Sequence, residues 1–454
     1  MFLRKIKSEG IAHLSYMIGS QGAAAVIDPR RDIDVYLEIA REESVNITHI
    51  FETHRNEDYV IGSIPLAERT GAQIHHGHAL DFAYGDPVKE GDAFRIGDME
   101  LRILETPGHT FESISIALFD TASGDIAVGV FTGDALFISD VGRTDFFPDR
   151  AKEVAGLLYD SIFEKILPLG DQTILYPAHG AGSVCGSGMA AREFSTLGYE
   201  RRNNPVLQKT DRREFVEYKI NEEHEQPPYF RTMEKFNQQG PPRKERPEYL
   251  PALTPEQLHD AQQNGLQVVD TRSPEAVAGA LIPGSIALPL NMLPAFAGWF
   301  LSYDRPIGLV IHSTDEVETA VRHLYRIGYD DIAGYLVGGL HAWEVRGKAY
   351  QTIPAIHAVD LTKKIEDSED FLLLDVRSPE EYRRKHLPDA HNVYVGHLPE
   401  HLDELDRSRK IVTFCGSGQR ALIAAALLKA AGFEDVENCF GSMKACAAVG
   451  CPVA

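Results

Sequence analysis

The sequence predicts an α/β protein with several domains, and three observations carry that prediction. The chain has 454 residues, which is too long for one hydrophobic core and indicates two to four domains. Its first part alternates short β-branched runs with amphipathic stretches. Its last part contains one pattern twice, at an offset of about one hundred residues. We therefore expect sheets covered by helices at the start, followed by two related domains with parallel sheets.

The composition is ordinary for a soluble globular protein, with 43% hydrophobic and 25% charged residues. No apolar run approaches the roughly 18 residues that a membrane span needs. The N-terminus leads directly into strand-like sequence and lacks the apolar core of a signal peptide, so we expect a cytoplasmic protein. The 45 Lys and Arg against 67 Asp and Glu give a net charge of −22, which disfavours nucleic acid and membranes as partners.

Strands are expected in the first domain wherever β-branched residues alternate or run together. Residues 24–28 and 47–51 are the clearest candidates, with a helix over 34–42 between them because Val35 and Ile39 have helical spacing. Further strands are predicted at 73–75, 101–104, 114–118 and 126–131. Polar residues follow these strands directly, which favours a site on the loops.

Four of these loop positions carry residues of a type that binds metal ions. Each follows a short apolar run: His54, His109, Asp134 and His179. A single histidine is more often a structural or surface residue than a ligand. Four ligand-type residues at strand ends, all able to meet at one edge of the sheets, favour a metal site.

The pattern resembles the metallo-β-lactamase superfamily, whose αββα sandwich is the fold that the resemblance implies for residues 1–205. In that superfamily the first metal loop has the form His-x-His-x-Asp-His, and later loops supply His, Asp and His. Here residues 54–59 are His-Arg-Asn-Glu-Asp-Tyr, so Asn56 and Tyr59 replace two imidazoles. Asn is a poor ligand for transition metals, and Tyr binds only strong Lewis acids. A dinuclear zinc hydrolase is therefore disfavoured.

What remains is His54, His109 and Asp134, and two imidazoles with one carboxylate form the facial triad of non-haem Fe(II) oxygenases. The sequence thereby resembles the persulfide dioxygenases of this superfamily. Gly142–Phe146 is shared with that subgroup and with related glyoxalase-like hydrolases. The resemblance implies one Fe(II) per chain, with O2 and a low-molecular-weight persulfide as substrates. Zn²⁺ is an alternative occupant on expression, because metal availability often outweighs site preference.

Two features depart from that subgroup. Its members usually keep the full histidine loop, which Asn56 and Tyr59 interrupt here, and glutathione-using relatives usually carry an aromatic residue after the position of His179. Arg201 is a candidate for binding the carboxylate of the thiol, with a solvated charge at a helix end as the alternative. Cys185 is a candidate sulfur relay or a small packing residue. The thiol carrier is left open.

Residues 206–251 differ in composition from what precedes them. Lys, Arg, Glu, Gln and Pro dominate, with Pro pairs at 227–228 and 241–242. The segment is predicted as a helical extension followed by a linker that runs along the surface.

The repeat defines two further domains, 252–350 and 355–454. In the second, a buried strand at 411–414 leads to Cys415 and a Gly-rich loop that opens a helix. Backbone N–H groups of such a loop, together with the helix dipole, stabilise an anionic sulfur. The candidate site is Cys415 as nucleophile and Arg420 as a fixed charge, with substrate contacts from Gly416, Ser417, Gly418 and Gln419. The loop resembles that of a rhodanese, with four residues between Cys and Arg where dual-specificity phosphatases have five.

The first repeat is expected to lack catalysis. Aligning the two repeats by sequence puts Ser313 at the nucleophile and Glu318 at the arginine. Serine has no persulfide chemistry, and an acidic loop repels anions, so this domain is predicted to be a spacer, a docking surface or a dimer contact within a homo-oligomer. The remaining cysteines, Cys439, Cys446 and Cys451, are interpreted as structural.

The combined prediction is a persulfide dioxygenase that releases sulfite, coupled to transfer of sulfane sulfur at Cys415. Sulfite and thiosulfate are the expected partners of that cysteine. Two alternatives stay open: a zinc-dependent thioesterase or glyoxalase-like hydrolase with a rhodanese attached, and a non-catalytic sulfur carrier. Residues Asn56 and Tyr59 oppose the first, and retention of the three ligands opposes the second, because burying polar groups is costly.

Overall fold

The computed structural model describes residues 1–183, 188–242 and 249–452. The chain forms two compact units. The first comprises Met1–Arg243 with Arg326–Gly328, and the second comprises Lys244–Tyr325 with Tyr329–Ala454. Within the described ranges, every helix is too short or too polar to span a bilayer.

The first unit is built on two mixed sheets, each with six strands among the described residues. One sheet has the order β1 (Phe2–Ser8), β2 (His13–Ser20), β3 (Ala23–Ile27), β4 (Asn46–Phe51), β5 (Gln73–Gly77) and β6 (Asp86–Val88). The other has the order β12 (Ser195–Thr196), β11 (Ile174–Pro177), β10 (Ala127–Gly133), β9 (Ile114–Asp120), β8 (Met99–Glu105) and β7 (Ala93–Ile96). The strands predicted from sequence are confirmed, with ends that differ by a few residues.

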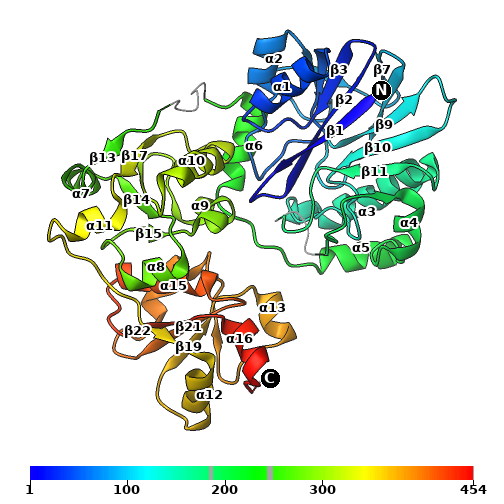
Figure 1. Ribbon diagram of the computed structural model, residues 1–454. Coiled ribbons are helices and arrows are strands. Elements are labelled where there is room, and N and C mark those ends of the chain that lie inside the picture. The colour runs from blue at the N-terminus through cyan, green and yellow to red at the C-terminus, as the bar shows by residue number, and fades with distance from the viewer. Residues whose placement is uncertain (184–187, 243–248, 453–454) are drawn as a thin grey trace. The chain divides into compact units, whose positions relative to one another are not determined.

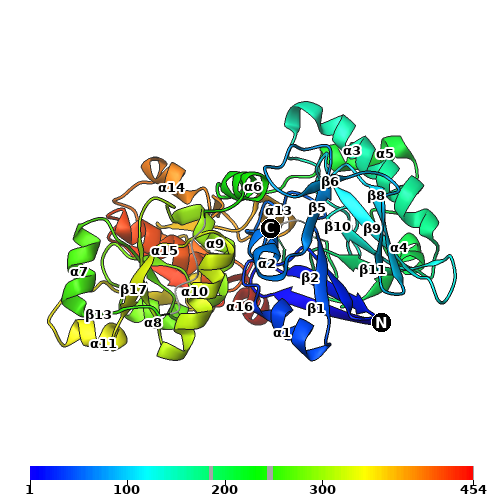
Figure 2. The ribbon, with the colours of Figure 1, turned by 90° about the horizontal axis from the view of Figure 1, so that it is seen from above.

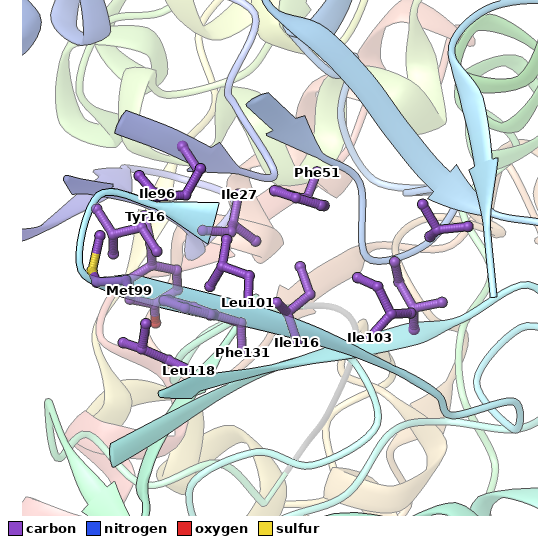
Figure 3. Packing of buried hydrophobic residues seen from close by; sticks show 14 residues of the cluster. Tyr16, Ile27, Phe51, Ile96, Met99, Leu101, Ile103, Ile116, Leu118 and Phe131 are labelled. Atoms are coloured by element: carbon purple, nitrogen blue, oxygen red, sulfur yellow. The ribbon is translucent and has the colours of Figure 1, made fainter. Parts of the chain in front are cut away.

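The two sheets pack face to face around one apolar core, which Figure 3 shows from close by. Strand β8 illustrates why the sequence folds this way, since Met99, Leu101 and Ile103 are buried while Glu100 and Arg102 point outward. Period-two alternation of this kind buries one face of a strand. Because both sheets are fixed by this core, the loops at their strand ends hold defined positions.

Helices cover the outer face of each sheet, which gives the αββα sandwich that the resemblance implied (Figures 1 and 2). On the first sheet lie α1 (Asp34–Glu42) and α2 (Ser63–Thr70), whose apolar faces join the core of that side. On the second lie α3 (Ala151–Asp160), α4 (Leu197–Asn203) and α5 (Arg212–Ile220). A π-helical turn at Ser161–Ile166 extends α3.

A further helix, α6 (Phe230–Gln239), lies in the segment 206–251, which was predicted as a helical extension followed by a linker. It belongs to the same compact unit and buries Phe230, Met233 and Asn237. The Asn237 amide donates to the carbonyls of Asn56 and Tyr59 at 2.6 and 2.7 Å, and accepts from a backbone N–H at 2.9 Å. Helix α6 therefore supports the loop that follows β4.

The second unit contains two α/β repeats with the same parallel sheet topology. The first sheet has the order β13 (Ala252–Leu253), β17 (Ile332–Leu336), β16 (Ile307–Val310), β14 (Gln267–Asp270) and β15 (Ile286–Ala287). The second has the order β18 (Ala355–Ile356), β22 (Val436–Cys439), β21 (Ile411–Phe414), β19 (Leu372–Asp375) and β20 (His391–Asn392). All strand pairs in both sheets are parallel, so the predicted fold class is confirmed.

Each parallel sheet is flanked by helices, as α/β folds require. The first repeat has α7 (Pro255–Gln263), α8 (Pro274–Gly279), α9 (Leu293–Phe300), α10 (Val317–Arg326) and α11 (Gly339–Glu344). The second has α12 (Ala358–Glu366), α13 (Pro379–Arg384), α14 (Leu398–His401), α15 (Gln419–Ala430) and α16 (Ser442–Val449). In Figure 1, α15 and α12 lie on opposite sides of β19, β21 and β22.

Candidate metal centre and cysteine loop

Three of the predicted ligand residues converge at one edge of the first unit. His54 follows β4, His109 lies between β8 and β9, and Asp134 follows β10 directly. Their ligand atoms all lie within 4.8 Å of one another. Gly133 makes this approach feasible, since its φ of +52° favours glycine and a Cβ there would lie 2.6 Å from the Thr53 hydroxyl.

Each of these three side chains is held in place by a contact of the polar atom that faces away from the centre. His54 Nδ1 lies 2.9 Å from the Thr53 hydroxyl, and His109 Nδ1 lies 3.0 Å from the Arg143 carbonyl. Asp134 Oδ1 lies 2.7 Å from His179 Nδ1. Three atoms face the centre: His54 Nε2, His109 Nε2 and Asp134 Oδ2. Asp134 Oδ2 lies 3.8 Å from His54 Nε2 and 3.6 Å from His109 Nε2. These three buried atoms have no hydrogen-bond partner among the described residues, which is the arrangement a metal ion satisfies.

The electrostatics of the centre favour a cation. Burial lowers the pKa of His54 to about 4, which keeps the ring in the neutral form that binds metals. Burial also disfavours the charged form of His109, but the Glu57 and Asp134 carboxylates outweigh it and raise the pKa of this ring to about 9. Burial raises the pKa of Asp134 too, yet the surrounding imidazoles, His179 foremost, hold it below its usual range. The site therefore keeps ionised carboxylates that attract positive charge.

The other residues of the superfamily's metal pattern have partners within the protein. His179 Nε2 lies 3.0 Å from Asp58 Oδ2, so His179 links two carboxylates and both of its ring nitrogens have partners. The Tyr59 ring packs against the His13 ring at a centroid distance of 4.0 Å. The Asn56 amide donates to the His54 carbonyl at 3.1 Å. The described geometry thus favours one ion over two.

Sequence reasoning passed over Glu57, which lies in the same loop three residues after His54. Its carboxylate is 3.2 Å from His109 Nε2 and 4.0 Å from His54 Nε2. The side chain is buried, with 1% of the residue exposed. The sequence offered one signal for Glu57, which is its place three residues after a candidate metal-binding histidine.

Arg201 does not join the three converging residues. Its guanidinium donates to the Leu167 carbonyl at 2.7 Å and pairs with Asp171 at 3.4 Å. These contacts match the alternative of a charge at a helix end. Basic residues do lie elsewhere near the centre, since a cavity of about 240 Å³ beside His179 is lined in part by Lys5 and Lys7, both of which pair with Glu193. Cys185 lies outside the described residues.

The candidate cysteine loop has the predicted shape. Cys415 directly follows β21, is 1% exposed, and its sulfur accepts from the Gly418 N–H at 3.0 Å. Gly418 begins α15 with a φ of +96°, a conformation that favours glycine. The Cys415 N–H donates to the Ser442 hydroxyl at 3.0 Å, and that hydroxyl donates to the Cys439 carbonyl at 2.7 Å. Within the same loop Ser417 is exposed, while Gly416 and Gln419 are half-buried.

Arg420 lies at the end of this loop, in the first turn of α15, and its guanidinium is bound by Glu381. Its guanidinium forms two hydrogen bonds with Glu381, at 2.6 and 2.8 Å. A Cβ on Gly416 would lie 3.3 Å from Arg420 Nη2, so the charge is adjacent to the loop. Burial raises the pKa of Glu381, but the bonds from Arg420 outweigh it and lower this pKa to about 2. Arg420 therefore offers only part of its charge to an anionic substrate.

The structure corrects the alignment of the two repeats. Strand pairing matches Asp270 with Val310 and Asp375 with Phe414, so Val310 corresponds to Phe414. The residue after Val310 is Ile311, which is 3% exposed and holds the place of Cys415. The expectation that Ser313 replaces the nucleophile is wrong by two residues.

The same shift moves the arginine position from Glu318 to Glu316. The Glu316 carboxylate accepts a hydrogen bond from the His312 backbone N–H at 3.3 Å. One backbone donor of the loop is therefore already bound to a carboxylate. Ser313 instead caps a 3-10 turn at Thr314–Glu316, and Glu318 pairs with Arg322 along α10. Ile311 supplies no nucleophile, and Glu316 puts a negative charge where the second repeat has Arg420, so this loop disfavours an anionic sulfur compound.

The other described cysteines are core residues. Cys439, Cys446 and Cys451 are buried in the apolar core of the second repeat. Burial raises the pKa of Cys439 to about 12 and that of Cys446 further. Cys446 corresponds to the buried Trp343 of the first repeat, which supports the structural interpretation.

Comparison with known proteins agrees with this geometry. The model of the metallo-beta-lactamase superfamily matches residues 9–179, and the model of the rhodanese-like domain matches residues 254–346 and 357–448. A crystal structure of a metallo-beta-lactamase from Staphylococcus aureus superposes with a TM-score of 0.67 at 34% identity, covering 74% of this chain and 98% of the other. The chain belongs to the metallo-beta-lactamase superfamily and carries two rhodanese domains behind that domain.

The curated relatives indicate the branch of the superfamily to which the chain is most similar. Over 215 residues the chain is 30% identical to human persulfide dioxygenase ETHE1, covering 46% of this chain and 76% of that protein. A beta-lactamase hydrolase-like protein of Agrobacterium fabrum is 28% identical over 228 residues, and this chain spans only about half of its length, 49%. By descent the chain is a fusion of the persulfide dioxygenase branch of the superfamily with two rhodanese domains, which confirms the predicted resemblance.

Proposed function

We propose that the first unit is a mononuclear non-haem Fe(II) dioxygenase for a low-molecular-weight persulfide, and that Cys415 transfers sulfane sulfur. Relatedness to persulfide dioxygenases and the rhodanese domains support a role in sulfur metabolism. One observation carries the proposal for the first unit. Three buried ligand atoms without hydrogen bonds face one another, while Asp58 and His179, which would bind a second ion, bond to each other.

The residues present fit an Fe(II) ion. His54, His109 and Asp134 would hold it, and it would supply the activation of O2 and the oxidation of sulfur. His179 fixes Asp134 through one ring nitrogen and is itself fixed by Asp58, so the carboxylate keeps one oxygen directed at the centre. The balanced reaction is R–S–SH + O2 + H2O giving R–SH + SO3²⁻ + 2H⁺.

The cysteine loop would act on the same class of sulfur compound. The Cys415 thiolate attacks the outer sulfur of a persulfide or thiosulfate, and the thiol or sulfite leaves with the electron pair. The Gly418 N–H, already bonded to the cysteine sulfur, stabilises the anion. An acceptor such as sulfite then takes the outer sulfur and releases the Cys415 thiolate. Residence of both sites on one chain raises the effective concentration of the shared intermediate.

Two variants separate these activities. His54→Ala removes a ligand and is expected to abolish persulfide-dependent O2 uptake while leaving sulfur transfer from thiosulfate to cyanide intact. Cys415→Ser is expected to keep O2 uptake but to release sulfite where the unmodified protein forms thiosulfate. Normal thiosulfate formation by Cys415→Ser would contradict coupling, and normal O2 uptake by His54→Ala would contradict the metal site.

A further inference from the structure

The loop that carries His54 is buried, although it lacks regular secondary structure. Residues 52–60, all of them described, lie between β4 and α2 and contain neither helix nor strand. Each of them except Arg55 is at most 2% exposed. Backbone N–H and C=O groups of such a loop are cut off from water, so they need partners inside the protein.

One side chain of α6 supplies three of these partners. The Asn237 amide donates to the Asn56 and Tyr59 carbonyls at 2.6 and 2.7 Å. Its oxygen accepts from the Ile61 N–H at 2.9 Å. Because Asn237 is itself only 1% exposed, these hydrogen bonds are shielded from water. Loss of the amide would leave buried backbone groups without this partner, which is costly.

The hydrogen bonds of this region lead to the proposed ligand. The Asn56 side chain, whose residue is held by Asn237, donates to the His54 carbonyl at 3.1 Å. The Tyr229 hydroxyl, directly before α6, donates to the Asp58 carbonyl at 3.1 Å. Helix α6 and the residue before it therefore hold the part of the loop that directly follows His54.

The two residues whose carbonyls Asn237 holds are the two that lack the imidazoles of the superfamily pattern. A metal-bound imidazole ties its loop to the ion, and Asn56 and Tyr59 do not supply that tie. On these grounds, and resting on the proposed metal function, we propose that Asn237 is a positioning residue of the metal centre. It holds the loop so that His54 faces the other two ligands before an ion binds. A loop that is already ordered adds no ordering cost to metal binding.

Asn204 offers a matched control. It is a fully buried asparagine of the same compact unit. Its amide donates to the Asp140 carbonyl at 3.0 Å and to the Glu200 carboxylate at 3.2 Å, and its oxygen accepts from the Val206 N–H at 3.1 Å. Replacing either asparagine by leucine removes three buried hydrogen bonds, but only Asn237 bonds to the loop after β4.

The test is a Co²⁺ titration of metal-free full-length protein, carried out well below the Tm of every variant. The dissociation constant, the d–d absorption spectrum and Tm are the readouts. Asn237→Leu is expected to weaken Co²⁺ binding by at least about tenfold and to shift the d–d bands, because the loop no longer holds His54 at the spacing of the site. Asn204→Leu is expected to lower Tm to a similar extent while keeping the affinity and the spectrum of the unmodified protein.

Unchanged Co²⁺ affinity and spectrum in Asn237→Leu would overturn the inference and assign Asn237 to stability alone. Equal losses of affinity in both leucine variants would overturn it as well. A failure of the unmodified protein to bind Co²⁺ any better than His54→Ala would instead overturn the proposed metal function, and the inference with it.

If Asn237→Leu does not fold, amide hydrogen exchange of the unmodified protein decides. Slow exchange of the Ile61 N–H without any metal supports a loop that Asn237 holds in advance. Exchange that becomes slow only after Co²⁺ is added contradicts the inference, because the ion would then order the loop.

Discussion

The two rhodanese domains share one framework and differ in their loops. In each, an aspartate that ends the second strand of the repeat pairs with an arginine two residues later, at 2.6 Å for Asp270–Arg272 and 2.5 Å for Asp375–Arg377. Both aspartates are fully buried, so in each domain the pair fixes the start of the loop that follows this strand. The Asp–Arg pair is therefore present also in the repeat that lacks the cysteine.

The loops that follow the third strand of each repeat differ at the nucleophile and at both members of the ion pair. Cys415 corresponds to Ile311, and the pair Glu381–Arg420 corresponds to Ala276 and Glu316. An arginine beside an anion-binding loop needs a partner when no anion is bound, and Glu381 provides it. Where the nucleophile is missing, both members of that pair are missing too. The comparison teaches that the pair serves the cysteine loop and the Asp–Arg framework serves the fold.

The largest expected effect comes from the nucleophile. Cys415→Ser is predicted to lower sulfur transfer from thiosulfate to cyanide by at least about a thousandfold, because serine forms no persulfide. The counterpart Ile311→Cys is predicted to add no activity in the Cys415→Ser background, since Glu316 occupies its loop. Thiocyanate formation measures both. Recovery of transfer by Ile311→Cys would break the comparison.

The next effect comes from the charge beside the loop. Arg420→Glu installs the residue type of the first repeat and is predicted to lower transfer by about a hundredfold, because two carboxylates then face an anionic sulfur compound. Arg384→Glu, an exposed arginine of α13 paired with Glu380, is the control and should leave the rate unchanged. A rate for Arg420→Glu equal to that of the control would show that the charge serves stability alone.

A smaller effect is expected at Ser442. This residue has a φ of +40° and corresponds to Gly339 of the first repeat, so glycine fits its backbone. Ser442→Gly removes the acceptor of the Cys415 N–H, which costs about 1 kcal/mol and about fivefold in rate. We expect kcat/KM to fall while Tm stays within about 2 °C. A lower Tm with an unchanged rate would assign Ser442 to stability instead.

The smallest effect concerns the Glu381–Arg420 pair and its pH dependence. The folded pKa of Glu381 is about 2 against an ordinary value of 4.5, so its stabilising effect is complete above pH 4.5 and is lost as pH falls toward 2. Because the Glu381 side chain is 41% exposed, we expect only about 1 kcal/mol after screening. The Tm difference between the unmodified protein and Glu381→Gln should shrink between pH 5 and pH 3. A difference that grows over this range would contradict the pairing.

Local patterns were sufficient to predict much of the fold. The helix expected over 34–42 is α1 (Asp34–Glu42), and the strand expected over 411–414 is β21 (Ile411–Phe414). Period and burial act within a few residues, so the sequence carries them directly. The candidate ligands were found because they lie within a few residues of the ends of such strands.

What sequence reasoning missed depends on contacts between distant segments. Helix α6 has a polar sequence, and only its contact with the loop after β4 reveals why Asn237 is buried. Glu57 gains its meaning from His109, which is brought beside it by a different sheet. The error at Ser313 arose because serine resembles cysteine chemically, whereas the hydrogen-bond register selects Ile311.

The central claim is that His54, His109 and Asp134 hold an iron that oxidises a persulfide. The most direct test is the metal content of protein purified without oxygen, combined with O2 uptake on addition of glutathione persulfide. We predict about one iron per chain and one O2 consumed for each persulfide that is oxidised to sulfite, with a second persulfide consumed without O2 for each thiosulfate formed at Cys415. One zinc per chain and no O2 uptake after reconstitution with Fe²⁺ would contradict it and favour a zinc hydrolase.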